Sequence, residues 1–382
     1  MIENKVKVYF PGLNALRFFA AFLVFASHVE LLKSRNGFEN YYYTPTFLEL
    51  GGSAVTFFFV LSGFLITYLL FIEKDLTGKI SLSQFYLRRI LRIWPLYYTV
   101  VLAGFFLFPH IPYLQNSISG ELHNDFYSKL ILFMLIMPNV SYILFPHTPY
   151  ISPAWSIGVE EQFYLAWPLL LSRTKKPLRL FMVLITGIFI IKAGLTILKK
   201  ISDDRTHEII QKILEIMYFT RFECMIIGSI CAYILHRKMY QALKILYTKY
   251  VQIFCYVTII IFLITGFKIP VLNHVIYSVL FGIIILNIAS NPDSIFKPEN
   301  KVLNYLGQIS FGLYMYHELA IGISLRFLKD LSFNFNNTSP NFLLYGVALL
   351  LTIGIASLSY YFLEKPFLKL KSRFSKISSS QN

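Results

Sequence analysis

Ten stretches of this sequence are each long and apolar enough to cross a membrane as an α-helix. A spanning helix needs about 20 mostly apolar residues, because the hydrocarbon core of a bilayer is about 30 Å thick. The stretches are residues 11–32, 51–72, 92–108, 155–172, 180–198, 217–235, 251–267, 275–290, 303–325 and 342–363. Only 14% of the residues are charged, whereas soluble domains have about 25%. We therefore expect an all-α polytopic membrane protein, and not a soluble enzyme, a disordered chain or a disulfide-linked secreted domain.

The basic residues predict how these helices are oriented. Lys and Arg are enriched in the cytoplasmic loops of membrane proteins. In this chain they cluster at residues 74–89, 173–179, 237–249 and 365–376. Ten spans with a cytoplasmic N-terminus place all four clusters in the cytoplasm, and the C-terminus as well. The lipid bilayer is then the main partner of the chain.

An eleventh apolar run, residues 129–145, is interrupted by Pro138 and Asn139. Counting it as a span would move the basic cluster at 173–179 to the outside. Irregular backbone at membrane depth is tolerated only where protein or a water-filled cavity covers it. We therefore expect 129–145 to be a re-entrant or interfacial segment within a long external loop, residues 109–154.

The net charge of +15 does not indicate a nucleic-acid partner in this chain, because the basic residues lie in loops between apolar stretches. The three cysteines lie within apolar segments and lack the spacing of metal ligands, so we expect small core residues and no bound metal or cofactor. Residues 9–368 are expected to form one membrane domain. A basic, Ser-rich cytoplasmic tail, residues 369–382, is expected to be too short to fold.

Arg17 and His28 lie on one face of the first predicted span. An ionisable residue inside a membrane costs at least about 2.5–3.5 kcal/mol, so each one suggests a function. The two residues are eleven positions apart, which is three helical turns plus about 20° and roughly 16 Å along the axis. Alternatively, Arg17 extends to the inner interface and His28 is hydrogen-bonded to a neighbouring carbonyl.

Three arginines crowd the start of the third predicted span. Arg88 and Arg92 are four positions apart and Arg89 and Arg92 are three apart, so they are neighbours on a helix. Their charges could orient the helix and contact lipid phosphates. Alternatively they bind an anion, because a guanidinium group pairs with two phosphate oxygens at once. Arg92 lies deepest and is the hardest to explain by topology.

The span at 155–172 has an acidic pair near its outer end. Glu160 and Glu161 project about 100° apart on a helix, so only one can face a given cavity. Glu160 shares a face with Tyr164 and Trp167, and we favour it as the functional residue. The alternative is a pair of acids exposed at the membrane interface.

Two further polar patterns lie in apolar segments. Ser310, Tyr314 and His317 follow the spacing i, i+4, i+7 in the span 303–325, and they form one stripe with His317 near the middle of the membrane. Hydrogen bonding within the core explains Ser310 better than it explains His317. In the span 217–235, Arg221 and Glu223 could form a local ion pair.

Seven motifs occur in a fixed order along the chain. They are Arg17-x10-His28, Phe58-Phe59-Val60-Leu61-Ser62-Gly63-Phe64, Arg88-Arg89-x2-Arg92-x2-Pro95, Trp155-Ser156-x3-Glu160-Glu161-Gln162-Phe163-Tyr164, Arg221-x6-Gly228, Ser310-x3-Tyr314-x2-His317 and Glu364-Lys365-Pro366. Together they resemble the integral-membrane acyltransferase family 3, which includes O-antigen and peptidoglycan O-acetyltransferases. Each motif alone has low specificity, whereas seven in order have high specificity. The resemblance covers about residues 9–368.

The resemblance implies an O-acyltransferase of the bacterial cytoplasmic (inner) membrane. Such an enzyme transfers an acyl group, most often acetyl, from acetyl-CoA or another acyl-CoA to a hydroxyl of a cell-envelope or exported saccharide. It implies catalytic roles for Arg17, His28, Glu160 and His317, and acyl-CoA binding by Arg17, Arg88, Arg89 and Arg92. We expect acceptor-binding or supporting roles for Trp155, Ser156, Tyr164, Arg221, Ser310 and Tyr314.

The sequence departs from the family pattern in two ways. Phe311 stands where the late motif commonly has Tyr, which removes one hydroxyl group. The extracytoplasmic hydrolase-like domain of many two-part members is absent from the sequence, so a stand-alone form is expected. Such an enzyme must meet the acceptor itself or pass the acyl group to a partner protein on the outer face.

We expect the donor phosphates to dock on the basic residues from the cytoplasm, with the pantetheine arm between the helices. His28 would activate the acceptor hydroxyl, or first accept the acyl group, and Glu160 and His317 would orient it or handle the proton. The alternative function is a saccharide or lipid-linked-sugar transporter or flippase. That protein would also bury Arg, His and Glu along a central path, but it would not consume acyl-CoA.

Overall fold

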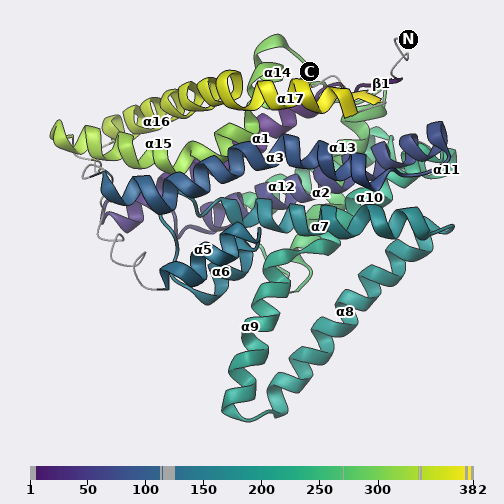
Figure 1. Ribbon diagram of the computed structural model, residues 1–382, viewed down its shortest axis with the longest axis horizontal. Helices are drawn as coiled ribbons and strands as arrows, with labels where there is room; N and C mark the ends of the chain where they lie inside the picture. The colour runs from purple at the N-terminus through teal and green to yellow at the C-terminus, as the bar shows by residue number, and fades with distance from the viewer. Residues whose placement is uncertain are drawn as a thin grey trace.

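The computed structural model describes residues 6–111, 114, 125–269, 271–333, 335, 338–374 and 377–379. Its helices are α1 (Leu13–Arg35), α2 (Pro45–Thr77), α3 (Leu82–Leu102), α5 (Phe126–Met134), α6 (Pro138–Leu144), α7 (Ala154–Arg173), α8 (Pro177–Ile201), α9 (Asp204–Thr220), α10 (Phe222–His236), α11 (Tyr240–Leu246), α12 (Lys249–Thr265), α13 (Asn273–Ser290), α14 (Lys301–Gln308), α15 (Ser310–Asp330), α16 (Thr338–Ser359) and α17 (Lys365–Lys371). A π-helical turn, Ala103–Leu107, extends α3, and another, Tyr360–Glu364, joins α16 to α17. Most of the long helices run along one direction of the molecule (Figure 1).

The all-α membrane class is confirmed, but the count of ten spans is not. In the described part of the chain, seven helical segments are long and apolar enough to cross a membrane, or eight if α11 and α12, which meet at 56°, form one broken span. Each of the ten predicted stretches lies on helix. The helices α7 and α15 are not among these segments, because they are less apolar. They carry the acidic residues Glu160, Glu161 and Glu318 within apolar surroundings.

The centre of the bundle is formed by α2 and α10, which pack backbone to backbone. Gly63 on α2 and Gly228 on α10 make this approach possible: a Cβ atom would lie 1.9 Å from the Met225 carbonyl oxygen at Gly63, and 2.0 Å from the Val60 carbonyl oxygen at Gly228. Small residues at helix crossings are the usual way in which membrane helices come close, because lipid supplies no hydrophobic force between them. These two glycines therefore fix the position of α2, which carries part of the site described below.

Gly228→Ala is expected to lower the melting temperature of the protein in detergent, with a loss of at least about 2 kcal/mol in the free energy of unfolding, because the added methyl group overlaps backbone that cannot move aside. Gly187→Ala on α8 is the matched control, since a Cβ atom there meets no atom within 4 Å. The control is expected to melt at or slightly above the wild-type temperature, because alanine favours helix. Equal melting temperatures for both variants would contradict the assigned crossing.

Two helices project from the bundle. Figure 1 shows α8 and α9 as a hairpin that extends away from the other helices. The side chains of Met182, Val183, Ile190 and Ile191 on α8 are all more than half exposed. We expect lipid to cover this apolar surface, because a large apolar surface is unfavourable in contact with water.

Several predicted elements differ from the structure in their boundaries. The apolar run 129–145 is broken as expected, and forms the short helices α5 and α6 on either side of residues 135–137. The surrounding loop, 109–154, is described only in part, because residues 112–113 and 115–124 lie outside the described residues. The span 217–235 is divided at Arg221, whose φ of 48° ends α9 and starts α10. The span 303–325 is divided at Ile309 between α14 and α15.

The two ends of the described chain lie together. The strand β1 (Val6–Val8) pairs in parallel with β2 (Ile377–Ser379), beside the end of α17 (Figure 1). The expectation of an unstructured tail after residue 368 was therefore wrong for the described part: α17 continues to Lys371, and β2 is paired, although residues 375–376 and 380–382 lie outside the described residues. The pairing places both ends of the described chain together at one end of the bundle, whereas their cytoplasmic location stays a prediction.

Candidate active site

A cavity of about 170 Å³ lies among α1, α2, α3, α7 and α15, and α17 reaches it from one side. Much of its lining is apolar, from residues such as Phe58, Leu61 and Ile157. Its charged lining consists of four basic residues and one acid, namely Arg17, Arg89, Arg92, Lys371 and Glu160. The cavity is therefore a mainly apolar space with a strong excess of positive charge.

The arginines come from two helices. Arg17 lies one helical turn after Asn14, and its guanidinium group donates a hydrogen bond to the Asn14 side chain at 3.2 Å. Arg89 lies over the rings of Tyr164 and Phe85, at 5.7 and 5.8 Å from their centroids. The Nε atom of Arg89 is buried without a hydrogen-bond partner. A buried donor without a partner is costly, so this guanidinium group is available to a ligand.

The acidic pair on α7 separates as the helix geometry predicts. Glu160 lines the cavity and accepts a hydrogen bond from the Tyr164 hydroxyl at 2.7 Å. Glu161 points to α3, where it accepts a hydrogen bond from the Trp94 indole nitrogen at 2.9 Å. The preference for Glu160 over Glu161 as the residue that faces the cavity agrees with this placement.

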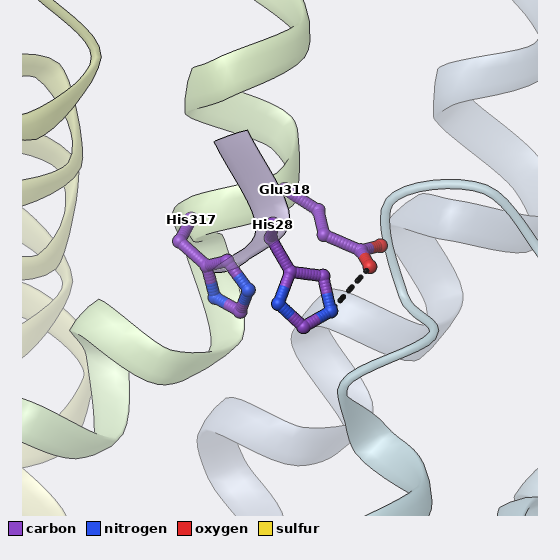
Figure 2. Close-up of side chains that lie close together, drawn as sticks. All are labelled: His28, His317 and Glu318. Atoms are coloured by element: carbon purple, nitrogen blue, oxygen red, sulfur yellow. Dashed lines mark ion pairs between the residues drawn. The ribbon is translucent and has the colours of Figure 1, made fainter. Parts of the chain in front are cut away.

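A second group of polar residues lies where α1 meets α15, and Figure 2 shows its three members. The ring centroids of His28 and His317 are 4.7 Å apart, with the rings edge to face. The Nε2 atom of His28 is 3.5 Å from a carboxylate oxygen of Glu318. Among the described residues, these three side chains are the group whose ligand atoms could hold a metal ion, since all lie within 4.8 Å of one another.

Backbone carbonyls fix the ring orientation of both histidines, and the tautomer of their neutral form. The Nδ1 atom of His28 lies 2.9 Å from the Val24 carbonyl oxygen, and Nδ1 of His317 lies 2.6 Å from the Tyr314 carbonyl oxygen. A carbonyl can only accept, so each Nδ1 carries a proton, and in the neutral ring Nε2 is the nitrogen with the lone pair. The Nε2 atom of His317 is buried without a hydrogen-bond partner. The Nε2 atom of His28 faces Glu318.

Hydrogen bonds connect this group with the cavity and with the loop before α7. Ser156 and Tyr314 both line the cavity, and the Ser156 hydroxyl donates to the Tyr314 oxygen at 2.8 Å. Tyr314 is also the residue whose carbonyl holds His317. Beyond the histidines, the Ser152 hydroxyl donates to Glu318 at 2.5 Å. Tyr314 therefore joins the two groups, because it lines the cavity and its backbone carbonyl contacts His317. We call the residues from Ser156 and Tyr314 to the two histidines and Glu318 the polar path.

Access to this path differs between its members. The His28 side chain is 23% exposed and that of Glu318 is 4% exposed, while His317 is buried. A molecule outside the bundle could therefore reach His28 but not its two neighbours. The cavity contacts the same path from the other side through Tyr314 and Ser156.

Some predicted site residues lie elsewhere. Arg88 does not line the cavity: it forms an ion pair with Glu73 at 2.6 Å and donates a hydrogen bond to the Phe374 carbonyl at 3.1 Å. Trp155 packs against Phe219, with the rings tilted and their centroids 4.0 Å apart, and it is also absent from the cavity lining. Ser310 does line the cavity, as do Ser156, Tyr164 and Tyr314.

Arg221 does not line the cavity and instead connects neighbouring helices. Its guanidinium group donates to the Gly52 carbonyl at 3.1 Å and lies 3.3 Å from Nδ1 of His274, so it links α10 to α2 and α13. The predicted ion pair between Arg221 and Glu223 was wrong, because Glu223 is paired with Lys192 of α8 at 2.7 Å. A chain position in the middle of an apolar helix gives no indication of which neighbouring helix supplies the partner.

Two residues of the site were not predicted from the sequence. Glu318 follows His317 directly, and an acid inside an apolar span was a signal that could have been used. Lys371 belongs to a cluster of basic residues near the C-terminus, where it resembles a residue that only sets the membrane orientation. Only the packing of α17 against α3 brings it to the cavity.

The chain matches a family of proteins described as an acyltransferase domain, over residues 10–361. It is 27% identical to the peptidoglycan O-acetyltransferase OatA of Listeria monocytogenes over 382 residues, which cover 94% of this chain and 56% of that protein. It is 28% identical to the O-acetyltransferase OatA of Staphylococcus aureus, over 94% of this chain and 57% of that protein. The chain therefore spans little more than half the length of these curated relatives. No solved structure matches it.

Proposed function

Because this chain belongs to the acyltransferase-domain family, we propose that it is a membrane O-acyltransferase that transfers an acyl group, most commonly acetyl, from cytoplasmic acyl-CoA to a hydroxyl of a cell-envelope saccharide. Two relatives are O-acetyltransferases, one of them of peptidoglycan. The observation that carries the proposal is the polar path between a cationic cavity and a partly exposed histidine. It supplies a site for an anionic donor on one side and for an acceptor on the other.

The donor would bind through its phosphate groups. CoA carries three phosphates, and Arg17, Arg89 and Arg92 line a cavity that contains only one acid. Guanidinium groups bind phosphate oxygens through paired, charge-assisted hydrogen bonds. The apolar part of the cavity would receive the pantetheine arm, which carries the thioester. The cytoplasmic origin of the donor follows from the predicted orientation of the helices.

His28 would act as the general base. Its Nδ1 proton is held by the Val24 carbonyl, so Nε2 can take the proton of an acceptor hydroxyl. The acceptor oxygen then attacks the thioester carbonyl carbon, the C–S bond breaks, and the departing CoA sulfur takes the proton back from His28. The Glu318 carboxylate, 3.5 Å away, stabilises the positively charged ring between these two transfers. The acceptor is the saccharide itself or a partner protein on the outer face.

Purified protein in lipid nanodiscs tests the proposal directly. Incubation with acetyl-CoA and soluble peptidoglycan fragments is expected to release free CoA and to produce O-acetylated fragments, detected by mass spectrometry. A transporter would move labelled saccharide into proteoliposomes without releasing CoA.

The acceptor class is tested independently by comparing the envelope glycans of cells with and without the gene. A mass gain of one acetyl group is expected only when the gene is present, and unchanged glycans would contradict the proposal.

A further inference from the structure

The C-terminal segment forms part of the cavity wall. The helix α17 packs against α3, and Lys371 at its end is 7% exposed while it lines the cavity. Val8 and Tyr9 also line the cavity. Val8 is the last residue of β1, which pairs with β2, and Tyr9 follows it. Segments near both ends of the chain therefore form part of the cavity wall, and Lys371 is the charged residue that they contribute to it.

The charged neighbours of Lys371 are cations. Arg92, Arg89, Arg88 and Arg17 all lie close enough to repel its ammonium group. Among the described residues, Lys371 forms no ion pair within 4.0 Å, and neither do Arg17, Arg89 and Arg92. Burial of an unpaired charge is costly. The described cavity lining contains four basic groups and one carboxylate, so it has an excess of positive charge that an anion would neutralise.

The position of Lys371 is held by contacts that do not involve its own side chain. Arg88 donates a hydrogen bond to the Phe374 carbonyl, three residues after Lys371, at 3.1 Å. Arg88 is itself held by Glu73 on α2 at 2.6 Å. The segment that carries Lys371 is therefore attached to α3 and α2, while the ammonium group stays without an acidic partner. Such an arrangement holds a cation at the cavity with no acid of the protein to neutralise it, as a site for an anionic ligand requires.

We propose that Lys371 binds a phosphate group of the acyl-CoA donor, together with Arg89 and Arg92, and that the C-terminal segment is therefore part of the donor site. This inference rests on the proposed function, since it identifies a further residue of the same site. Lys371 is separated from the arginines by most of the chain, so only the folded protein unites them.

The test compares the binding of free CoA to three variants of the full chain in nanodiscs, by isothermal titration calorimetry. Lys371→Met keeps the length of the side chain and removes the charge, and we expect its Kd for CoA to rise about tenfold, which corresponds to the loss of one charge-assisted contact. Lys371→Arg keeps the charge and is expected to stay within about threefold of the wild type, because a lysine binds phosphate as a point charge. Lys369→Met, an exposed lysine of the same helix, is the matched control and is expected to bind as the wild type does.

A second measurement separates ligand binding from a structural role. Without CoA, Lys371→Met is expected to melt at or above the wild-type temperature, because a buried, unpaired charge has been removed. A lower melting temperature together with unchanged CoA affinity would overturn the inference and make Lys371 a structural residue. If the wild type binds CoA and Lys371→Met binds it equally well, only the inference fails. If the wild type does not bind CoA at all, the proposed function fails with it.

Discussion

Replacing His28 with alanine is expected to lower kcat for acyl transfer by about 10²- to 10⁴-fold, the range that a general base contributes. His28 combines surface access with an Nδ1 atom bonded to a backbone carbonyl, and it lies on the polar path. The exposed His207 has a similar contact, 3.0 Å from its Nδ1 atom to the Lys199 carbonyl oxygen, but it lies neither in the cavity lining nor on that path. His317 has the same bond, but it is buried. The measurement is the rate of CoA release from acetyl-CoA in the presence of acceptor, at saturating donor.

Two further variants define this role. His207→Ala removes an exposed histidine of α9 and is expected to leave kcat unchanged. Glu318→Gln keeps the shape of the side chain but removes the negative charge that faces His28 at 3.5 Å. Its kcat is expected to fall by less than that of His28→Ala, because the base itself is retained. An active His28→Ala enzyme with normal kcat would refute the assignment of the base.

Replacing Arg89 and Arg92 together with methionine is expected to raise KM for the acyl-CoA donor at least about a hundredfold, because each charge-assisted hydrogen bond contributes about 1.5–3 kcal/mol. Phosphates distant from the thioester are bound equally well before and during the reaction. Loss of such uniform binding raises KM and leaves kcat nearly unchanged. Initial rates at varied donor concentration measure this, with acceptor held at saturation.

The matched control is Arg173→Met, which removes an exposed charge at the end of α7. Its KM for the donor is expected to stay within about twofold of the wild type, since an exposed charge far from the cavity is screened by solvent. If the double variant lost affinity for the acceptor while KM for acyl-CoA stayed the same, the cationic cavity would belong to the acceptor and the donor would bind elsewhere.

Local patterns along the sequence were sufficient for part of the site. Helical periodicity distinguished Glu160 from Glu161, and the structure places Glu160 in the cavity lining and Glu161 against Trp94. The eleven-residue spacing predicted a shared face for Arg17 and His28. Arg17 lines the cavity, whereas His28 contacts His317 and Glu318, which are not part of its lining. His317 is joined to the cavity only through Tyr314. Periodicity gives the direction of a side chain, but not its neighbours.

The count of spans and the ion pairs were less predictable, because both depend on contacts between helices. The helices α7 and α15 carry acids that make them less apolar than ordinary spans. Such acids are stable within a membrane only where neighbouring helices shield them from lipid and supply polar partners. Glu223 is paired with Lys192 from another helix instead of nearby Arg221. The sequence contained both charges of each pair but no information on which helices touch.

What the sequence alone determined is the membrane class, the approximate place of every helix and the types of residue that bear the chemistry, because apolar length and helical period are local properties of a chain. What the tertiary structure decided is which of these residues meet. Arg88 is neutralised by Glu73, whereas Lys371 comes to the cavity from the far end of the chain. The physical reason is that the charge balance of a buried site is a sum over neighbours in space, and neighbours in space are chosen by the packing of helices.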